Sequence, residues 1–185
     1  TFTTSGVTNG YYGLRTGIVI PDGAIAHCYS NYNVKTDSKL LWMNAAEVAF
    51  LRAEGALRGW NMGGTAKTFY EEGVRLSFDQ WGVSGVQNYL ADKTSTPAIY
   101  NDPMGLNSYT GSTSTITIAW DDAASTDTNL ERIITQKWLA NFPLGQEAWT
   151  EYRRTGYPKL MPVVVNNSGG IVNSNRGARR LYYPQ

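Results

Sequence analysis

The residues best suited to chemistry gather in one stretch, TQKWLANFPLGQEAWTEYRRTGYP, which spans residues 135–158. This stretch holds two tryptophans, a phenylalanine, two tyrosines and a double arginine. Aromatic rings and guanidinium groups can bind a ligand, and they can equally hold neighbouring helices together. Which of these roles applies depends on the direction in which the side chains face on the helices that carry them.

The second half of the stretch predicts a helix over residues 146–155. Helical spacing separates the double arginine: Arg154 is expected to form an exposed ion pair with Glu151, and Arg153 to stack on Trp149. The aromatic side chains are expected to point inward. We therefore predict a structural clamp between helices, with direct ligand binding as the weaker alternative. Six side chains would make this clamp: Trp138, Phe142, Trp149, Tyr152, Arg153 and Arg154.

Other residue types with catalytic or metal-binding potential are few. The single histidine and single cysteine are neighbours, His27 and Cys28, whereas a structural zinc site needs about four ligands. Glycoside hydrolysis needs two carboxyl groups about 5–10 Å apart. The carboxylates at 71–72 and at 121–122 are adjacent in sequence, so their side chains diverge. The sequence predicts no catalytic residue, no metal site and no cofactor, and hence a protein that is not an enzyme.

Composition narrows the remaining classes of partner. The formal net charge of +1 over 185 residues predicts no nucleic-acid binding and no polybasic membrane patch. No apolar run reaches about 18 residues, so no transmembrane helix is expected, and the first ten residues do not form a signal peptide. Hydrophobic residues make up 42% of the chain, enough to bury a core.

Two helices are expected to position these side chains. The first should begin near Asp37 or Ser38 and end at Gly59, and it is apolar nearly all round, which is typical of a helix buried on most sides. The second should span residues 66–81, capped by Thr65. Small residues on the facing sides would let the helices approach closely, as in a tetratricopeptide hairpin.

The remaining chain predicts a mainly α fold with long irregular loops. A capping box at residues 128–131 is expected to open a helix that ends near Asn141. We divide one domain fragment into five stretches: a loop-rich segment at 1–36 with a short strand at 17–20, a helical hairpin plus a short helix at 37–92, a long surface loop at 93–127, a helical pair with the aromatic stretch at 128–156, and an irregular tail at 157–185.

Three blocks of this sequence resemble the SusD/RagB family of nutrient-binding outer-membrane lipoproteins. They are QKWLANFPLGQEAWTEYRRTGYP, LWMNAAEVAFLRAEGALRGWNMGGTAKTFYEEGVRLSF and RRLYYPQ, and together they reach from about Lys39 to Gln185. Members of the family are longer, so the resemblance implies that this is a partial chain, the C-terminal part. The lipidated N-terminal cysteine and much of the usual glycan site would then lie outside it.

The resemblance implies a fold and a function. The fold would be SusD-like, built on tetratricopeptide-type hairpins. The protein would lie on the extracellular face of a Gram-negative outer membrane, held only by a lipid anchor absent from this chain. It would cap a TonB-dependent, SusC-like transporter and capture oligosaccharides for import, or peptides in some members. A scaffold that binds only proteins remains the alternative.

Family members bind sugar mainly through aromatic platforms and polar hydrogen bonds. Tyrosines in predicted loops are therefore the candidate ligand-binding residues, and packing of the same rings on the helical core is an equal alternative for each. They are Tyr11, Tyr12, Tyr29, Tyr32, Tyr100 and Tyr109.

Overall fold

The computed structural model describes four parts of the chain: residues 11–18, 29–30, 35–111 and 114–178. Contacts group the chain into two compact units. Unit 1 comprises the described residues of Thr1–Lys39, Ala98–Thr113 and Leu160–Gln185. Unit 2 comprises Leu40–Pro97 and Ser114–Lys159.

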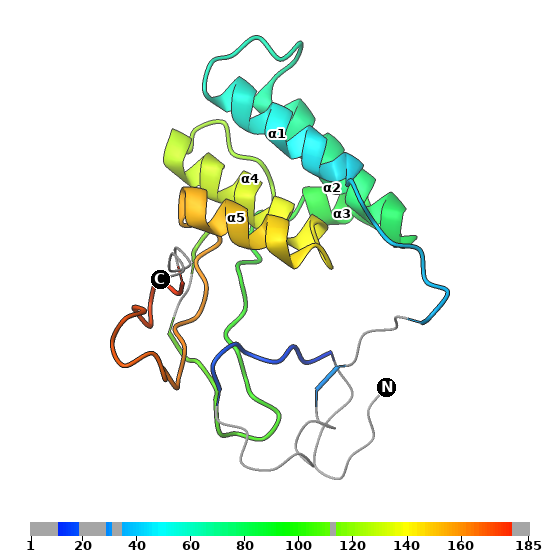
Figure 1. The fold of residues 1–185 in the computed structure, drawn as a ribbon. Coiled ribbons are helices and arrows are strands. Elements are labelled where there is room, and N and C mark those ends of the chain that lie inside the picture. Colours follow the sequence, from blue (N-terminus) through cyan, green and yellow to red (C-terminus); the bar gives the residue numbers. More distant parts are fainter. Residues whose placement is uncertain (1–10, 19–28, 31–34, 112–113, 179–185) are drawn as a thin grey trace, which may run out of the picture. The chain divides into compact units, whose positions relative to one another are not determined.

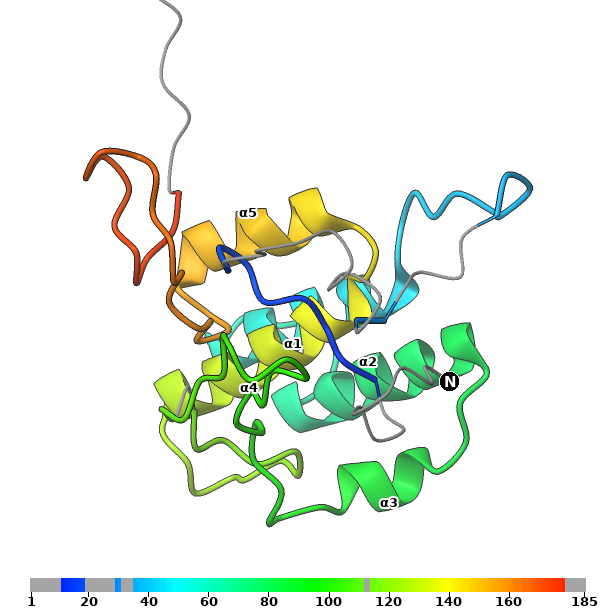
Figure 2. The same ribbon diagram turned by 90° about the horizontal axis from the view of Figure 1, so that it is seen from below.

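Unit 2 carries every helix of the described residues (Figure 1). The helices are α1 (Ala45–Leu57), α2 (Ala66–Trp81), α3 (Val86–Leu90), α4 (Thr126–Ala140) and α5 (Gly145–Thr155). Helices α1 and α2 form the hairpin, α4 packs on α1, α5 packs on α4, and the short α3 lies beside α2 (Figure 2). None of the helices in the described residues is long and apolar enough to cross a membrane.

The hairpin follows directly from local sequence signals. Thr65 caps α2, since its hydroxyl oxygen accepts a hydrogen bond from the Thr68 amide at 3.1 Å. Gly82 ends α2 in the left-handed conformation, with φ of +62°. Gly73 lets the helices meet closely, because a Cβ at that position would lie 2.8 Å from the Phe50 ring. The predicted hairpin is thus confirmed.

The core of unit 2 lies where α1, α2 and α4 meet. Phe50, Tyr70 and Ile133 are among its fully buried side chains, one from each helix. The Tyr70 hydroxyl donates a hydrogen bond to the Ile118 carbonyl at 2.6 Å, which satisfies the polar end of a buried ring. Burial raises the pKa of Tyr70 well above its usual value.

The predicted start of the first helix is wrong. Helix α1 begins at Ala45, and the side-chain oxygen of Asn44 caps it by accepting from the Ala46 amide at 2.9 Å. The Asn44 amide group also donates to the Ala140 carbonyl at 2.5 Å, at the end of α4. Asn44 is 2% exposed, so this bond between helices fixes the position of the cap.

The expected burial of α1 on most sides is also wrong. Val48 and Leu51 are each 47% exposed, while the charged Glu54 is buried. Packing on α2 and α4 covers two sides of this helix and leaves a third uncovered.

The predicted cap of the fourth helix is wrong by one turn. Helix α4 begins at Thr126, and the Ser125 hydroxyl oxygen accepts from the Thr128 amide at 3.1 Å. Glu131 therefore takes no part in a capping box. It is buried, accepts from the Ser114 hydroxyl and lies 2.9 Å from the Lys159 ammonium group.

The described residues of the predicted loop at 93–127 contain no helix before Thr126, but the loop is not wholly at the surface. Its parts belong to both units, and Ile116 and Ala119 are buried in unit 2. The described residues contain no β-strand beyond one isolated bridge between Tyr100 and Tyr109. The strand expected at 17–20 falls partly outside the described residues and stays a prediction.

Candidate functional site

The aromatic stretch of the sequence contributes to a network of charged side chains inside unit 2. Lys137 of α4 is only 2% exposed. Its ammonium group lies 3.2 Å from a carboxylate oxygen of Glu47 on α1 and 3.2 Å from one of Glu151 on α5. A buried ammonium is tolerated only when it is paired, because water no longer solvates it. Lys137 therefore ties three helices together.

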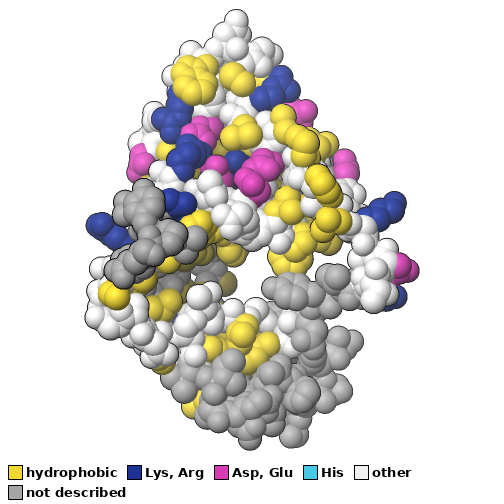
Figure 3. Space-filling view, viewed as in Figure 1, with side chains coloured by type: hydrophobic (Ala, Val, Ile, Leu, Met, Phe, Trp, Pro, Cys, Tyr) yellow, Lys and Arg dark blue, Asp and Glu magenta, His cyan; other side chains and the backbone are white. Residues whose placement is uncertain are grey.

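A second cation extends the network toward the protein surface. Arg154 of α5 donates to both carboxylate oxygens of Glu54 on α1, at 2.7 and 2.6 Å, and to Glu151 at 2.7 Å. Arg58 also donates to Glu54, at 2.7 and 2.9 Å. Figure 3 shows these acidic and basic side chains gathered between α1 and α5. The predicted pair of Arg154 with Glu151 forms, but the expectation that it is exposed is wrong, because Glu151 is buried. Glu54 is the partner that helical spacing alone did not indicate.

The network alters the protonation of its members. Burial raises the pKa of Glu54, but hydrogen bonds from Arg154 and Arg58 outweigh burial, and the pKa of Glu54 lies below its usual value near 4.5. The hydrogen bonds that Arg154 donates to Glu54, and to a lesser degree to Glu151, raise the pKa of its guanidinium. Both shifts keep the pair ionised.

The lowered pKa of Glu54 makes the free energy of unfolding depend on pH. The unfolded chain binds a proton at this glutamate at a higher pH than the folded protein does. The stabilising contribution of ionised Glu54 is therefore complete above about pH 6. It is lost as the pH falls through 4.5 and on toward the pKa of Glu54 in the folded protein. We expect the Glu54→Gln variant to lose less stability than the original protein between about pH 6 and pH 3 in urea titrations.

Glu72→Gln is the matched control, because the Glu72 carboxylate is 46% exposed and lies 3.9 Å from Arg52 at the surface. This variant should keep the pH dependence of the original protein. Equal pH dependence in both variants and the original protein would contradict the role given to Glu54.

The expectation that the aromatic side chains of the stretch point inward is wrong. The buried residues of α5 are Ala148 and Glu151, whereas Trp149 and Tyr152 are half-buried. On α4 and just beyond it, Trp138 is half-buried and Phe142 is exposed. The ion pairs of Glu151 with Lys137 of α4 and with Arg154 of α5 itself account for its burial, so a charged side chain occupies the buried face of α5 beside Ala148.

The expected stacking of Arg153 on Trp149 is confirmed, with the guanidinium carbon 4.5 Å from the ring centroid. We expect Trp149→Ala to lower the free energy of unfolding by about 1–2 kcal/mol, since the ring is half-buried and the stacking is lost. Urea denaturation measures this change, and Trp149→Phe should lose less. A cost near 4 kcal/mol for Trp149→Ala would indicate full burial of the ring instead.

Unit 1 brings several of the predicted ligand-binding tyrosines together. The backbones of Tyr100 and Tyr109 exchange hydrogen bonds at 3.2 and 2.8 Å, and the Tyr100 hydroxyl donates to the Gly13 carbonyl at 2.9 Å. Arg15 is buried, lies 5.1 Å from the centroid of the Tyr109 ring and donates to the Asn107 carbonyl at 2.9 Å. Tyr100 and Tyr109 thus form a half-buried aromatic patch held by backbone hydrogen bonds.

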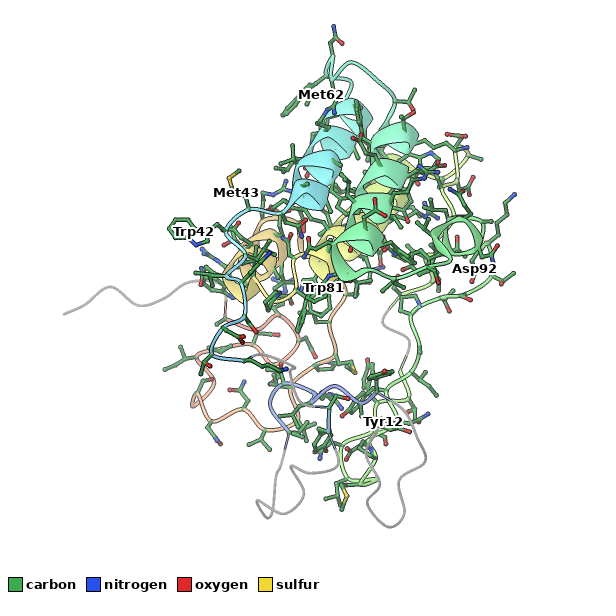
Figure 4. The ribbon with its side chains drawn as sticks, turned by 90° about the vertical axis from the view of Figure 1, so that its right-hand side faces the viewer. Tyr12, Trp42, Met43, Met62, Trp81 and Asp92 are labelled. Atoms are coloured by element: carbon green, nitrogen blue, oxygen red, sulfur yellow. The ribbon has the colours of Figure 1, made fainter. Side chains whose placement is uncertain are left out.

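The other tyrosines of unit 1 differ in exposure. Tyr11 is 96% exposed and precedes Tyr12, whose amide donates to the Ser30 hydroxyl oxygen at 2.9 Å. The Tyr12 ring is half-buried and lies among the side chains of unit 1 (Figure 4). Tyr29 is buried, and its hydroxyl donates to Asp102 at 2.6 Å, so its ring offers no platform.

Asp102 organises the turn beside these rings. Burial raises its pKa, but hydrogen bonds from the Tyr29 hydroxyl and from the Asn107 and Leu106 amides outweigh burial and leave the pKa below its usual value. A charged Asp102 therefore fixes the backbone that leads to Tyr109. Tyr32, His27 and Cys28 lie outside the described residues.

The described residues hold no cluster of three or more histidine, cysteine, aspartate or glutamate side chains that could bind a metal ion. Glu71, from one of the carboxylate pairs, accepts a hydrogen bond from Arg75 at 3.1 Å one turn further along α2. Asp121, from the other pair, accepts from the Ala123 amide at 2.9 Å. Both carboxylates thus have structural partners close by in sequence.

Comparison with known protein families identifies the family of this chain. The family described as SusD-like, "Susd and RagB outer membrane lipoprotein", matches residues 1–185. The chain belongs to the SusD/RagB family. Membership places this SusD-like chain in a family that is described as outer-membrane lipoproteins. The search of curated proteins found no match.

Solved structures agree with this membership. A chitin-binding SusD homologue from Flavobacterium johnsoniae is 52% identical with a TM-score of 0.89, and the match covers 96% of this chain and 37% of that one. A SusD homologue from Bacteroides thetaiotaomicron is 52% identical with a TM-score of 0.88, covering 97% and 39%. A third, from Bacteroides uniformis, is 60% identical with a TM-score of 0.81, covering 84% and 33%. The SusD-like chain thus spans 33–39% of the length of these three relatives.

These relatives confirm the mainly helical, tetratricopeptide-like fold class. In this SusD-like chain the residues that sequence reasoning missed are Glu47 and Glu54, seven residues apart on α1. Two carboxylates at that spacing lie on one face of an otherwise apolar helix, which is a usable signal for buried cations on a neighbouring helix. Lys137, within the aromatic stretch, is the buried cation with which Glu47 pairs.

Proposed function

We propose that this SusD-like chain is part of a protein on the extracellular face of the outer membrane that captures oligosaccharides for import through a TonB-dependent, SusC-like transporter. It acts by binding and has no enzymatic activity. A lipid anchor outside these residues holds it to the membrane. The observation that carries the proposal is the aromatic patch of unit 1, together with Tyr11, which is almost fully exposed and lies two residues before the Gly13 carbonyl that accepts from Tyr100.

The ligand surface follows from the exposure of the rings. Tyr11 offers both faces to solvent, while Tyr12, Tyr100 and Tyr109 each offer part of the ring. A tyrosine ring has an apolar face and a polar edge, which suits the alternating CH and OH groups of a sugar. Tyr32, outside the described residues, stays in the proposed set, and the buried Tyr29 leaves it.

One relative indicates which glycans to test first. The Flavobacterium johnsoniae homologue, 52% identical, binds chitin. We therefore propose β-linked oligosaccharides of N-acetylated amino sugars as the first ligand class, with other glycans next. Peptide binding and a purely protein-binding scaffold are the competing functions, and the binding measurements described next distinguish them from glycan capture.

The test is a glycan array with the full-length protein, followed by calorimetry on any glycan that binds. We expect Tyr11→Ala to weaken glycan binding about tenfold, equivalent to about 1.4 kcal/mol, with unchanged unfolding. Trp60→Ala, which removes an exposed ring from unit 2, is the control and should bind normally.

Binding of peptides and of no glycan would overturn the proposal of sugar capture. Equal glycan affinity in Tyr11→Ala and in the original protein would keep sugar capture but remove Tyr11 from the binding surface. Pull-down of a SusC-like transporter with the full-length protein tests the proposed transport partner separately.

A further inference from the structure

One arginine of unit 1 is buried without the partners that a buried charge ordinarily has. Arg15 is 8% exposed, and it forms no ion pair within the residues that the structure describes. It donates only to two carbonyl oxygens, those of Asn107 at 2.9 Å and Pro162 at 2.5 Å, and its Nε–H has no hydrogen-bond partner there. A buried cation without a contacting carboxylate lowers stability. Stability alone therefore does not account for an arginine at this position.

A second buried arginine, Arg132 of α4 in unit 2, has a complete set of acceptors. It is 3% exposed, and its Nε–H donates to the Thr117 carbonyl at 2.9 Å. Its two terminal nitrogens donate to the side chains of Asn129 and Thr117. Arg15 leaves one nitrogen unused by comparison. An incompletely satisfied polar group is expected at a site where function, and not stability, determines the residue.

Arg15 joins three segments of unit 1. It lies within residues 11–18, drawn in dark blue in Figure 1, the segment that begins with the exposed Tyr11. One of its carbonyl acceptors, Asn107, lies two residues before the ring of Tyr109. The other, Pro162, belongs to the C-terminal part of unit 1. The guanidinium thus links the segment that carries Tyr11 to the segment that carries Tyr109.

The same guanidinium restricts the ring of Tyr109. Its central carbon lies 5.1 Å from the ring centroid, within the range of a cation–π contact. The ring also meets Gly111 closely, because a Cβ at that position would lie 2.6 Å from the Tyr109 hydroxyl oxygen. Asp102 fixes the acceptor on the other side of the contact, since its carboxylate accepts from the Asn107 amide at 2.9 Å. Arg15 and Gly111 together leave the half-buried ring little freedom to turn.

We propose that Arg15 is a positioning residue of the glycan-binding surface. It holds the Tyr109 ring, and the segment that carries Tyr11, in the orientation that a sugar binds, without touching the ligand itself. A surface ordered in advance binds more tightly, because its side chains are not immobilised at the moment of binding. This inference rests on the proposed capture of glycans and adds the residue that orders the surface.

The test uses the full-length protein with a fluorinated tyrosine at position 109, whose fluorine resonance reports on that ring alone. We expect Arg15→Met and Arg15→Lys to shift or split this resonance, because neither side chain has the planar guanidinium fork. Arg15→Lys keeps a charge and hydrogen-bond donors, so it remains informative where Arg15→Met impairs folding. Calorimetry with the strongest glycan of the array, a chitin oligosaccharide being tested first, should show affinity weakened about tenfold in either variant.

Arg132→Met is the matched control, because it removes a buried guanidinium from unit 2. It should leave the fluorine resonance and the glycan affinity unchanged, even where it lowers stability. An unchanged resonance in both Arg15 variants, with glycan binding by the original protein intact, would overturn the inference and leave sugar capture standing. A changed resonance with undiminished affinity would overturn it too, as would equal effects of Arg132→Met. Absence of glycan binding by the original protein would overturn sugar capture and, with it, this role of Arg15.

Discussion

Replacing Lys137 with methionine should lower the free energy of unfolding by about 3–5 kcal/mol. The change keeps the length and apolar stem of the side chain but removes its charge. Glu47 and Glu151, each 3.2 Å from the ammonium group, then face one another across a buried space without their shared cation. Leaving buried charges uncompensated costs far more than losing an exposed ion pair. Chemical denaturation followed by circular dichroism measures the change.

Lys67→Met is the control for this experiment, because Lys67 is an exposed lysine on α2. A surface substitution of this kind should change the free energy of unfolding by no more than about 0.5 kcal/mol. A second comparison sharpens the test: adding Glu151→Leu to Lys137→Met should recover part of the loss, since one unpaired carboxylate is removed. Equal, small effects of the two lysine substitutions would show that the network contributes little.

Replacing Phe50 with alanine should cost about 3–5 kcal/mol, the range for truncating a buried aromatic side chain. Phe50 is 1% exposed and packs edge-to-face on Tyr70, with ring centroids 6.1 Å apart. Its ring also fills the space that Gly73 leaves open on α2. Truncation would therefore open a cavity at the contact between the two helices of the hairpin.

Val83→Ala is the control for Phe50→Ala, because Val83 follows α2 and is exposed. This change should cost less than about 1 kcal/mol in the same urea titration. A partial rescue of Phe50→Ala by Gly73→Ala would support the cavity explanation, because the added methyl group enters the space vacated by the ring. A small effect of Phe50→Ala alone would contradict the central place of this ring in the core.

The charged network holds only one side of α1. Arg154 fastens α5 to α1 through Glu54, whereas Val48 and Leu51 on another side of α1 are each 47% exposed. Phe142, predicted as part of the structural clamp, is 45% exposed, and its ring packs on that of Trp81 at the end of α2.

Several features could be predicted from the sequence because they depend on near neighbours in the chain. Thr65 and Gly82 set the two ends of α2, and Gly156 ends α5 in the left-handed conformation. The stacking of Arg153 on Trp149 and the pair of Arg154 with Glu151 follow from helical spacing alone. The family was also recognisable from the sequence, since its motifs are contiguous stretches of residues.

Other features needed contacts between residues far apart in the chain. The start of α1 is set by Asn44, which is held by the carbonyl of Ala140, almost a hundred residues later. The tyrosine patch of unit 1 depends on backbone pairing between Tyr100 and Tyr109, at the ends of an irregular segment that no periodicity predicts.

The hairpin, most helix ends and the family of this chain could be predicted from the amino-acid sequence, because local hydrogen bonds and residue spacing carry that information. Which face of α5 is buried depends on contacts with other helices. A helical wheel assigns charged residues to solvent, and Glu151 and Lys137 are buried because each neutralises the other inside the protein. That mutual neutralisation exists only once α4 and α5 have packed together, so no local pattern could reveal it.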